Sequence, residues 1–314
     1  MPHYLLFNGD ADGICAAQQL LLANPQEVEP ITGVKREISL LQRIESVSNA
    51  QITVLDISVE KNLPALKKLL DQDCHICWFD HHESPEIPDH PNFDCYIDTQ
   101  PDINTSLLVS QFLEKGVSLW SIVGLFGDNM HQKAESLARE LQLVNQKINL
   151  LKELGELLNY NAYGGSIDDL FFHPAQLLEK VKPFSDPFSF LEEGSTVEIL
   201  KSGRDEDLQK ANSTKQLSSG IYVFPNEKWA RRVIGIYANK TAQKEPDQAH
   251  AVLVQTKKDG YLVSVRSPIN GNLNAAEFCS QFPTGGGRKK AAGINFLPEN
   301  LLADFIDRFH NYYG

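Results

Sequence analysis

Three short apolar runs in the first 82 residues each end in carboxylates or histidines. Apolar runs of this length, separated by stretches with helical periodicity, are typical of parallel strands in an open α/β sheet. The carboxyl ends of such strands meet at one edge, where these sheets bind ligands. The runs are 5–7, 52–55 and 76–79, and they lead into Asp10-Ala11-Asp12, Asp56 and Asp80-His81-His82. The sequence therefore predicts an N-terminal parallel sheet with helices on both faces and an acidic crevice at one edge.

The crowding of acids at that edge indicates a bound cation. An Asp after a single strand is more often a helix cap, because its side chain accepts backbone hydrogen bonds. The same ending after three successive strands is hard to explain by capping alone. Ionised carboxylates cannot crowd together unless a cation lies between them. We therefore expect one divalent metal ion or a pair of them, and metal-assisted hydrolysis of a phosphate ester.

A fourth strand-helix unit follows in the sequence. Residues 95–97 are expected to form a strand and 107–113 a helix. Thr105 and Ser106 would cap this helix, or its N-terminus would bind a phosphate, and both interpretations stay open. After a further apolar helix at 119–126 comes Asp128, which is a candidate for another metal ligand.

Further along the chain, periodicity predicts more helices and a second set of strands. The helices are expected at 137–158, 174–178 and 191–217, and the strands at 221–224, 233–237 and 251–255. The Pro-containing segment 182–187 should interrupt any helix.

Two segments near the C-terminus combine basic residues with small ones. In 261–266 the alternation of period 2 places Ser264 and Arg266 on one face of a strand. Three successive glycines would let backbone N–H groups turn toward an anion without obstruction by a Cβ atom. A helix-forming Ala291-Ala292 follows them. The sequence therefore predicts a phosphate clamp made of Arg266, Ser264, Gly285, Gly286, Gly287 and Arg288.

In order and spacing, the acidic motifs resemble the N-terminal motifs of the DHH phosphoesterase superfamily. These motifs are Asp10-Ala11-Asp12-Gly13, Asp56, Asp80-His81-His82 and Gly127-Asp128-Asn129. Segments 264–267 and 285–293 resemble the DHH-associated C-terminal domain of nanoRNases and RecJ-like nucleases. The resemblance implies a DHH domain at 1–189, a helical linker at 190–218, and a smaller α/β substrate-binding domain at 219–314 across a cleft.

The resemblance also implies roles for individual residues. Asp10 and Asp56 would hold one metal ion, and Asp56 would bridge to a second. Asp80 would orient a histidine, and His82 would touch the scissile phosphate or protonate the leaving oxygen. The family's usual metal is manganese, with magnesium as the alternative. The second ion would be held by Asp12, Asp56, His81 and Asp128.

Two residues depart from the family pattern. Many relatives have His or Asp where this chain has Asn8, and a neutral amide there would weaken the first metal site or leave it to water. Many relatives also have His after the glycines, where this chain has Arg288. A guanidinium can still bind phosphate but cannot transfer a proton.

Composition restricts the partners of the chain. The formal charge of −12 argues against a protein that grips long nucleic acid, because that needs a broad basic surface. No apolar run is long enough to span a membrane, and the N-terminus lacks the pattern of a signal peptide, so we expect a cytoplasmic protein. An odd number of scattered cysteines does not predict a disulfide framework.

Together with the motifs and the charge, the resemblance implies a metal-dependent phosphodiesterase of the nanoRNase type that cleaves dinucleotides or very short oligoribonucleotides, for example pGpG or pApA, to mononucleotides. One alternative is another DHH activity: a cyclic dinucleotide phosphodiesterase, a RecJ-like single-strand exonuclease or a nucleotide phosphatase. The other alternative is a nucleotide-binding sensor without turnover, which Asn8 suggests. Base preference and oligomeric state cannot be predicted from the sequence.

Overall fold

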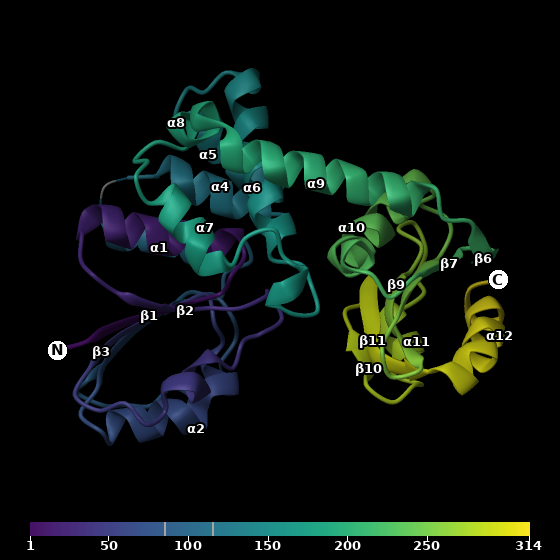
Figure 1. Cartoon of the computed structure of the whole chain (residues 1–314), viewed down its shortest axis with the longest axis horizontal. Coiled ribbons are helices and arrows are strands. Elements are labelled where there is room, and N and C mark those ends of the chain that lie inside the picture. Colours follow the sequence, from purple (N-terminus) through teal and green to yellow (C-terminus); the bar gives the residue numbers. More distant parts are fainter. Residues whose placement is uncertain (85, 115) are drawn as a thin grey trace. The chain divides into compact units, whose positions relative to one another are not determined.

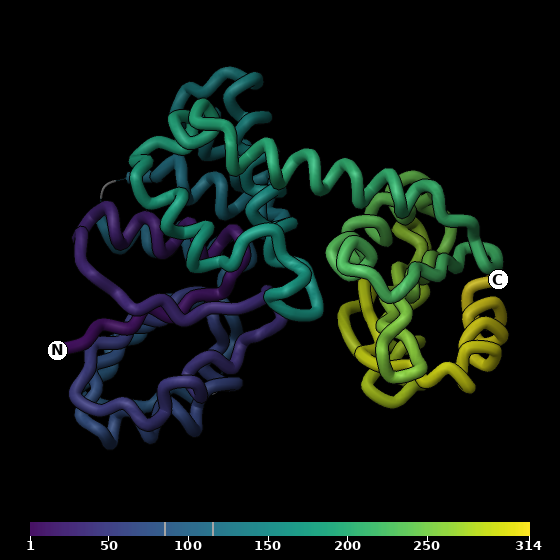
Figure 2. The backbone as a smooth tube through the Cα atoms, viewed as in Figure 1, coloured from purple at the N-terminus to yellow at the C-terminus, as the bar shows by residue number. Residues whose placement is uncertain are grey.

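The computed structural model describes residues 1–84, 86–114 and 116–314, and it divides the chain into two compact units. The first unit comprises residues 1–202 and the second comprises residues 203–314. Figure 2 traces the chain through α9 (Ser195–Asn212), the helix in which the division falls. The division lies inside the segment 190–218 that the sequence predicts as the connection.

Five parallel strands form the sheet of the first unit. Their order is β2-β1-β3-β4-β5, which reverses direction between β1 and β3. In open α/β sheets ligands bind at such a reversal, beyond the carboxyl ends of the strands. The strands are β1 (His3–Phe7), β2 (Glu29–Ile31), β3 (Gln51–Leu55), β4 (His75–Asp80) and β5 (Phe93–Ile97).

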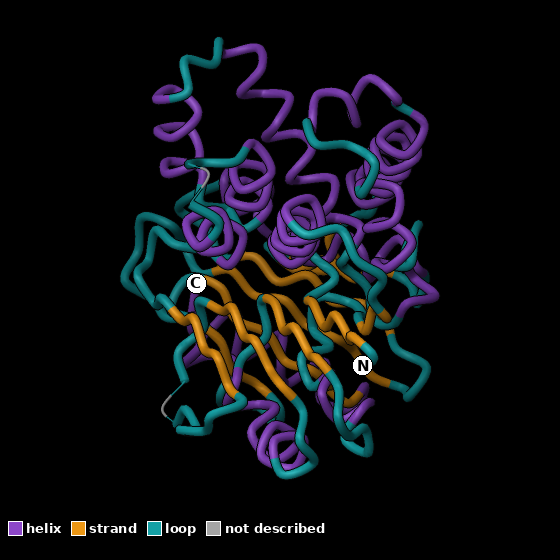
Figure 3. Tube along the Cα trace, turned by 90° about the vertical axis from the view of Figure 1, so that its left-hand side faces the viewer, coloured by secondary structure: helices purple, strands orange, loops and turns teal. Residues whose placement is uncertain are grey.

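Helices cover both faces of this sheet, as the sequence predicts (Figure 1; Figure 3). Alternate strand residues point to opposite faces, so each strand contributes to two cores. Leu6, Val54 and Trp78 pack with α2 (Val59–Leu70) and the 3₁₀ helix η1 (Leu40–Ile44). On the other face, Leu5, Phe7 and Phe79 pack with α1 (Ala11–Ala23), α3 (Thr105–Phe112) and α4 (Leu119–Gly127).

The helical part of the first unit differs from the sequence prediction in its boundaries. The single helix expected at 137–158 is wrong, because Gln142 has a left-handed φ of 60° and separates two helices. The helix expected at 191–217 is likewise interrupted, because Gly194 has a φ of 77°. The helix that begins after Gly194 is α9, and it ends at Asn212. The helices here are α5 (His131–Glu140), α6 (Asn145–Asn161), η2 (Ile167–Asp169), α7 (Pro174–Val181) and α8 (Pro187–Glu193).

The second unit contains a mixed sheet with the strand order β10-β11-β9-β8-β7-β6. β7 and β8 are parallel, and the other neighbouring strands are antiparallel. Its helices are α10 (Lys228–Lys244), α11 (Ala275–Cys279) and α12 (Leu302–Tyr313), with a 3₁₀ turn η3 (Glu299–Leu301). Its strands are β6 (Gln216–Ser218), β7 (Ile221–Phe224), β8 (His250–Gln255), β9 (Gly260–Arg266), β10 (Gly285–Gly287) and β11 (Ala291–Pro298).

Two predictions for the second unit are wrong. Residues 233–237 lie inside α10 rather than in a strand, because Val233, Ile234 and Tyr237 follow helical spacing and are buried on one face. The triple-glycine segment is the edge strand β10 rather than a loop, and Ala291 and Ala292 begin β11 rather than a helix. No helix in the described ranges has the length and apolar character needed to cross a bilayer.

Candidate metal centre

Asp10 and Asp12 follow β1 and begin α1. Asp10 is the N-cap: its Oδ1 accepts hydrogen bonds from the backbone N–H groups of Asp12 and Gly13, each at 3.1 Å. The cap turns the chain so that Asp12 occupies the first turn of α1. Both carboxylates are 1 % exposed. The N-cap of α1 is therefore Asp10 and not Asp12.

Asp12 lies against the N-terminus of α3. Its Oδ2 accepts from Thr105 N at 2.9 Å and its Oδ1 from Ser106 N at 2.7 Å. The expectation that Thr105 and Ser106 cap α3 is wrong, because Asn104 is the cap and accepts from Leu107 N at 3.0 Å. The N–H groups at this helix end, which were candidates for binding a phosphate, donate instead to the Asp12 carboxylate. They hold Asp12 in place.

Asp56 occupies an unusual backbone conformation directly after β3. Its φ is 58°, in the left-handed region that non-glycine residues rarely adopt, and its N–H donates to Phe79 O at 3.0 Å. Its Oδ1 accepts from Thr105 Oγ1 at 3.2 Å. Asp tolerates this region better than most residues, and strained residues at functional sites are held by neighbouring contacts. Here the contacts aim the Asp56 carboxylate into the group of acids.

His81, Asp56 and Asp128 converge on one point. His81 Nε2 lies 3.4 Å from Asp56 Oδ1 and 3.5 Å from Asp128 Oδ2. Ligand atoms bound at ~2.1 Å lie about 3 Å apart when adjacent in an octahedron, so these spacings suit atoms that share an ion. The side chains form two groups whose ligand atoms lie within 4.8 Å of one another: Asp56 with His81 and His82, and Asp12 with His81 and Asp128.

Two glycines let α4 bring Asp128 to this point. A Cβ atom on Gly124 would lie 2.1 Å from Ser106 Oγ, and one on Gly127 would lie 2.3 Å from Ala11 Cβ. Both distances are far below van der Waals contact, so only glycine lets α4 pack this closely against α1 and α3. Asp128 follows immediately as the C-cap of α4, with its side chain 16 % exposed.

The carboxylates repel one another in the absence of a cation. Burial and then Asp128 raise the pKa of Asp12 to about 6. Burial, Asp10 and Asp12 raise the pKa of Asp56 well above its ordinary value. A divalent cation would relieve this repulsion, and an oxygen-rich set with one imidazole suits Mn²⁺ or Mg²⁺. The residues present therefore fit a metal ion.

His82 is held by a buried carboxylate beside the cluster. Its Nδ1 lies 2.7 Å from Asp80 Oδ1, and its side chain is 47 % exposed. The hydrogen bond to Asp80 raises the pKa of His82, although burial opposes the shift. The structure thus leaves one face of His82 accessible while its orientation is fixed.

Lys35 is the residue of this centre that sequence reasoning missed. It follows β2, and its Nζ lies 2.5 Å from Asp10 Oδ2, 3.3 Å from Asn159 Oδ1 and 3.4 Å from Asp128 Oδ1. Burial lowers the pKa of Lys35, but Asp10 and Asp128 outweigh it and hold the pKa well above its ordinary value. Lys35 is therefore a cation in contact with two of the expected metal ligands.

Asn8 also lies at the carboxyl end of β1 and is 6 % exposed. Within the described residues its Oδ1 has no hydrogen-bond partner, and neither has Asp80 Oδ2. A buried amide oxygen without a partner is costly, and a cation or an ordered water would satisfy it.

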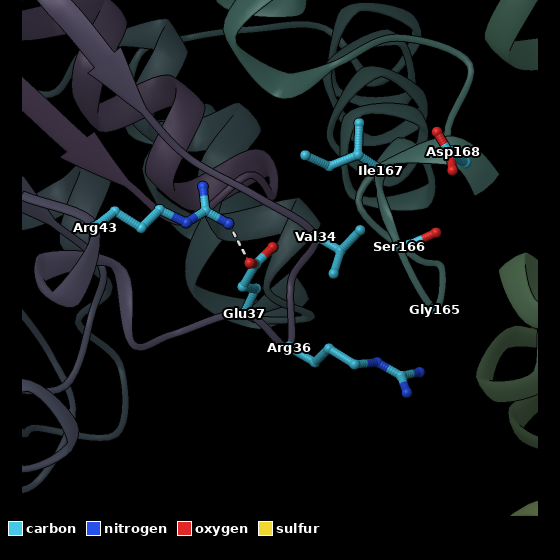
Figure 4. A pocket seen from close by; sticks show the side chains of 8 residues that line it. All are labelled: Val34, Arg36, Glu37, Arg43, Gly165, Ser166, Ile167 and Asp168. Atoms are coloured by element: carbon cyan, nitrogen blue, oxygen red, sulfur yellow. Dashed lines mark hydrogen bonds and ion pairs between the residues drawn. The ribbon is translucent and has the colours of Figure 1, made fainter.

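A pocket of about 450 Å³ lies beside the segment that carries Lys35 (Figure 4). Figure 4 shows Arg36 extending away from the ion pair between Glu37 and Arg43. Burial lowers the pKa of the Arg36 guanidinium, although Asp169 opposes the shift. The rest of the lining comes from Val34 and from residues 165–168 after α6. No sequence pattern predicts this pocket. Part of its lining follows β2, a strand of three residues whose sequence gives no clear strand signal.

In the second unit, Arg266 is anchored by its own domain. Its Nε donates to Asn239 Oδ1 at 2.6 Å, and its Nη1 donates to Ser264 Oγ at 2.9 Å. Lys290 is engaged as well, because its Nζ donates to Pro268 O at 2.6 Å. Arg288, by contrast, is exposed in the turn between β10 and β11.

The strand pairing brings the predicted clamp residues to one end of the second sheet. Ala291, which follows the turn, pairs with Arg266, and Gly287 pairs with Ala292. Gly285 is required by packing, since a Cβ there would lie 1.8 Å from Cys279 O of α11. Gly285 thus allows the close approach of β10 to α11.

Comparison with known proteins agrees with this architecture. Residues 217–314 match the DHHA1 domain family. No curated protein matches the chain in sequence.

Among solved structures, exonuclease RecJ bound to manganese superposes with a TM-score of 0.65 at 16 % identity, covering 99 % of this chain and 89 % of that one. The DHH domain of a protein assigned to a family of ribosomal proteins superposes with a TM-score of 0.62 at 14 % identity, covering 99 % of this chain and 86 % of that one. The pGpG-specific phosphodiesterase PggH from Vibrio cholerae superposes with a TM-score of 0.53 at 12 % identity, covering 98 % of this chain and 97 % of that one. The chain therefore carries a DHHA1 domain at residues 217–314 and has the fold of the DHH family, as its motifs indicate.

Proposed function

We propose that this protein is a metal-dependent phosphodiesterase that cleaves dinucleotides or very short oligoribonucleotides to mononucleotides. The observation that carries the proposal is the convergence of Asp12, Asp56, His81 and Asp128, with His82 beside them. An acidic centre of this kind binds divalent ions, and its position at the reversal of strand order is where ligands reach such sheets. RecJ bound to manganese and PggH, both similar in fold, support the reaction class.

In this proposal the metal supplies charge neutralisation and a more acidic water when it is bound. Asp12, Asp56, His81 and Asp128 hold it. Thr105 supports two of these carboxylates at once, through its N–H to Asp12 and its hydroxyl to Asp56. Asp80 fixes His82, which in its protonated form donates a proton to the leaving oxygen.

The preference for short substrates is supported by charge. The formal net charge of −12 opposes the binding of a polyanion along an extended surface. Local basic residues remain, among them Arg36, which follows Lys35 in the chain, and Arg288 in the second unit. We propose that Arg288, with Ser264, Arg266 and the glycines 285–287, contacts the terminal phosphate of the substrate. The molecules pGpG and pApA fit this description.

A RecJ-like exonuclease on single strands is the second candidate, favoured by the TM-score of 0.65 with RecJ. One panel separates the two: linear di- to decanucleotides and cyclic dinucleotides, each with Mn²⁺ and with Mg²⁺. The proposed function requires dinucleotides to be cleaved fastest. Faster cleavage of the longer strands would favour the RecJ-like candidate, and binding without product would indicate a sensor.

A further inference from the structure

The environment of Asp10 differs from that of the other acids in the centre. Its Oδ1 receives two backbone N–H groups, and its Oδ2 receives Lys35 Nζ at 2.5 Å. An ionised carboxylate oxygen offers about two lone-pair sites, so Oδ1 is saturated and Oδ2 already faces a positive charge. Among the described residues, neither group that could hold a metal includes Asp10.

Lys35 is also saturated by this arrangement. An ammonium carries three donors, and Lys35 Nζ has three acceptors: Asp10 Oδ2, Asp128 Oδ1 and Asn159 Oδ1. Its backbone is tied to the same helix end, because Lys35 N donates to Ala162 O at 3.0 Å. Asn159 is held in turn by Tyr163, whose hydroxyl lies 2.7 Å from Asn159 Nδ2. The ammonium is therefore fixed by protein contacts.

From these contacts we infer that Lys35 is a built-in cation that takes the place of one metal ion, so that the centre binds a single divalent ion. That ion is held by Asp12, Asp56, His81 and Asp128. Asp128 joins the two cations, since its Oδ1 faces Lys35 at 3.4 Å and its Oδ2 faces His81 at 3.5 Å. The neutral side chain of Asn8 agrees with this arrangement, because it adds no negative charge for a second divalent ion.

This inference rests on the metal-dependent function proposed above and replaces the expectation of two ions. The test is Mn²⁺ binding measured by calorimetry, with Mn²⁺ alone as the probe. The natural protein should bind one Mn²⁺ per chain. Lys35→Ala should free the oxygens of Asp10, Asp128 and Asn159 and bind two. The matched control is Lys67→Ala, which removes a lysine that pairs with Glu86 on the exposed side of α2 and should leave the count at one.

Electron paramagnetic resonance gives an independent readout. A single bound Mn²⁺ has the spectrum of an isolated ion, whereas two ions that share ligands are spin-coupled. The natural protein should show the isolated spectrum and Lys35→Ala the coupled one. Two ions in the natural protein would overturn the inference and leave the proposed function intact. No bound ion in the natural protein would overturn the metal-dependent function itself.

A second pair of variants tests the inference if Lys35→Ala does not fold. Asp10→Asn keeps a good N-cap for α1, because Asn caps as well as Asp. If Asp10 pairs with Lys35 and is not a metal ligand, Asp10→Asn should change Mn²⁺ affinity less than tenfold. Asp12→Asn should weaken it more than a hundredfold. Equal and large losses in both variants would show that Asp10 is a metal ligand and that Lys35 does not replace an ion.

Discussion

His82 Nδ1 lies 2.7 Å from Asp80 Oδ1, and the carboxylate that holds it is completely buried. The same hydrogen bond raises the pKa of His82 and fixes which ring nitrogen faces outward. A buried Asp behind an accessible His is an arrangement that orients a proton donor. It lies beside the metal centre, because the rings of His81 and His82 are 4.6 Å apart.

Asp80→Asn should lower the pKa of His82, since a neutral amide stabilises the imidazolium less than a carboxylate does. A proton donor must be protonated, so activity falls as pH rises above its pKa. The alkaline limb of the pH profile of kcat/KM should therefore move to lower pH in Asp80→Asn. His82→Ala should remove that limb. An alkaline limb at the same pH in Asp80→Asn and the natural protein would exclude this role.

Asp56→Asn should stabilise the metal-free protein and weaken its binding of the metal. Burial and the neighbouring acids raise the pKa of Asp56, so its ionised form is unfavourable in the metal-free protein. Asn also tolerates the left-handed φ of 58° at this position. We expect Asp56→Asn to melt at a higher temperature than the natural protein in EDTA, and to lose most of the increase that Mn²⁺ gives.

Thermal unfolding in EDTA and in Mn²⁺ measures both effects of Asp56→Asn, with activity expected to fall by several orders of magnitude. Asp71→Asn is the control, because Asp71 is exposed at the end of α2. A variant that retains the full Mn²⁺-dependent increase would contradict the ligand role of Asp56.

Metal affinity should depend on pH through Asp12. Burial and Asp128 raise its pKa to about 6, and a protonated carboxyl must lose its proton to bind a metal. Mn²⁺ affinity should therefore fall as the pH drops below this pKa, by at least roughly tenfold per pH unit, because Asp56, whose pKa is also raised, must lose its proton as well. Calorimetry at several pH values, in buffers of different ionisation enthalpy, would also count the proton released. Constant affinity down to about pH 4.5, well below that pKa, would contradict this assignment.

The sequence predicts part of this centre because the relevant signals are local. Asp56 follows an apolar run directly, Asp12 and His81 come within a few residues of one, and parallel pairing brings the ends of such runs together. Lys35 has no such signal. It follows a three-residue edge strand that contains Pro30, and its partner Asn159 is 124 positions away in α6. Contacts of that kind depend on tertiary packing, which periodicity does not encode.

The glycines of the second unit are another case in which the local sequence pattern does not predict the structure. Gly285, Gly286 and Gly287 resemble a flexible turn in sequence, yet they pair with β11 as a strand. At Gly285 only glycine fits, because a Cβ would lie 1.8 Å from Cys279 O of α11, a helix that the local pattern does not reveal. The strand expected from Val233 to Tyr237 is wrong for a related reason. Their short apolar run does not distinguish a strand from a turn of buried helix.

Arg288→Ala should reduce activity selectively on substrates that carry a terminal phosphate. Arg288 is exposed in the β10–β11 turn, so its removal should not disturb the fold, whereas Arg266 is tied to Asn239 and Ser264. One charge-assisted contact to phosphate contributes about 1.5 to 3 kcal/mol, which corresponds to a loss of roughly 10- to 150-fold in kcat/KM. We expect that loss on 5′-phosphorylated dinucleotides and little change on bis-p-nitrophenyl phosphate, which requires only the metal centre.

The control for Arg288→Ala is Lys258→Ala, an exposed cation in the turn between β8 and β9, which should leave both substrates unaffected. Removing the 5′-phosphate from the dinucleotide should make the natural protein and Arg288→Ala equally slow, because the contact is then absent from both. Equal losses of Arg288→Ala on the dinucleotide and on the reporter would assign Arg288 to the fold or to the metal centre. A loss that persists without the 5′-phosphate would place its contact elsewhere on the substrate.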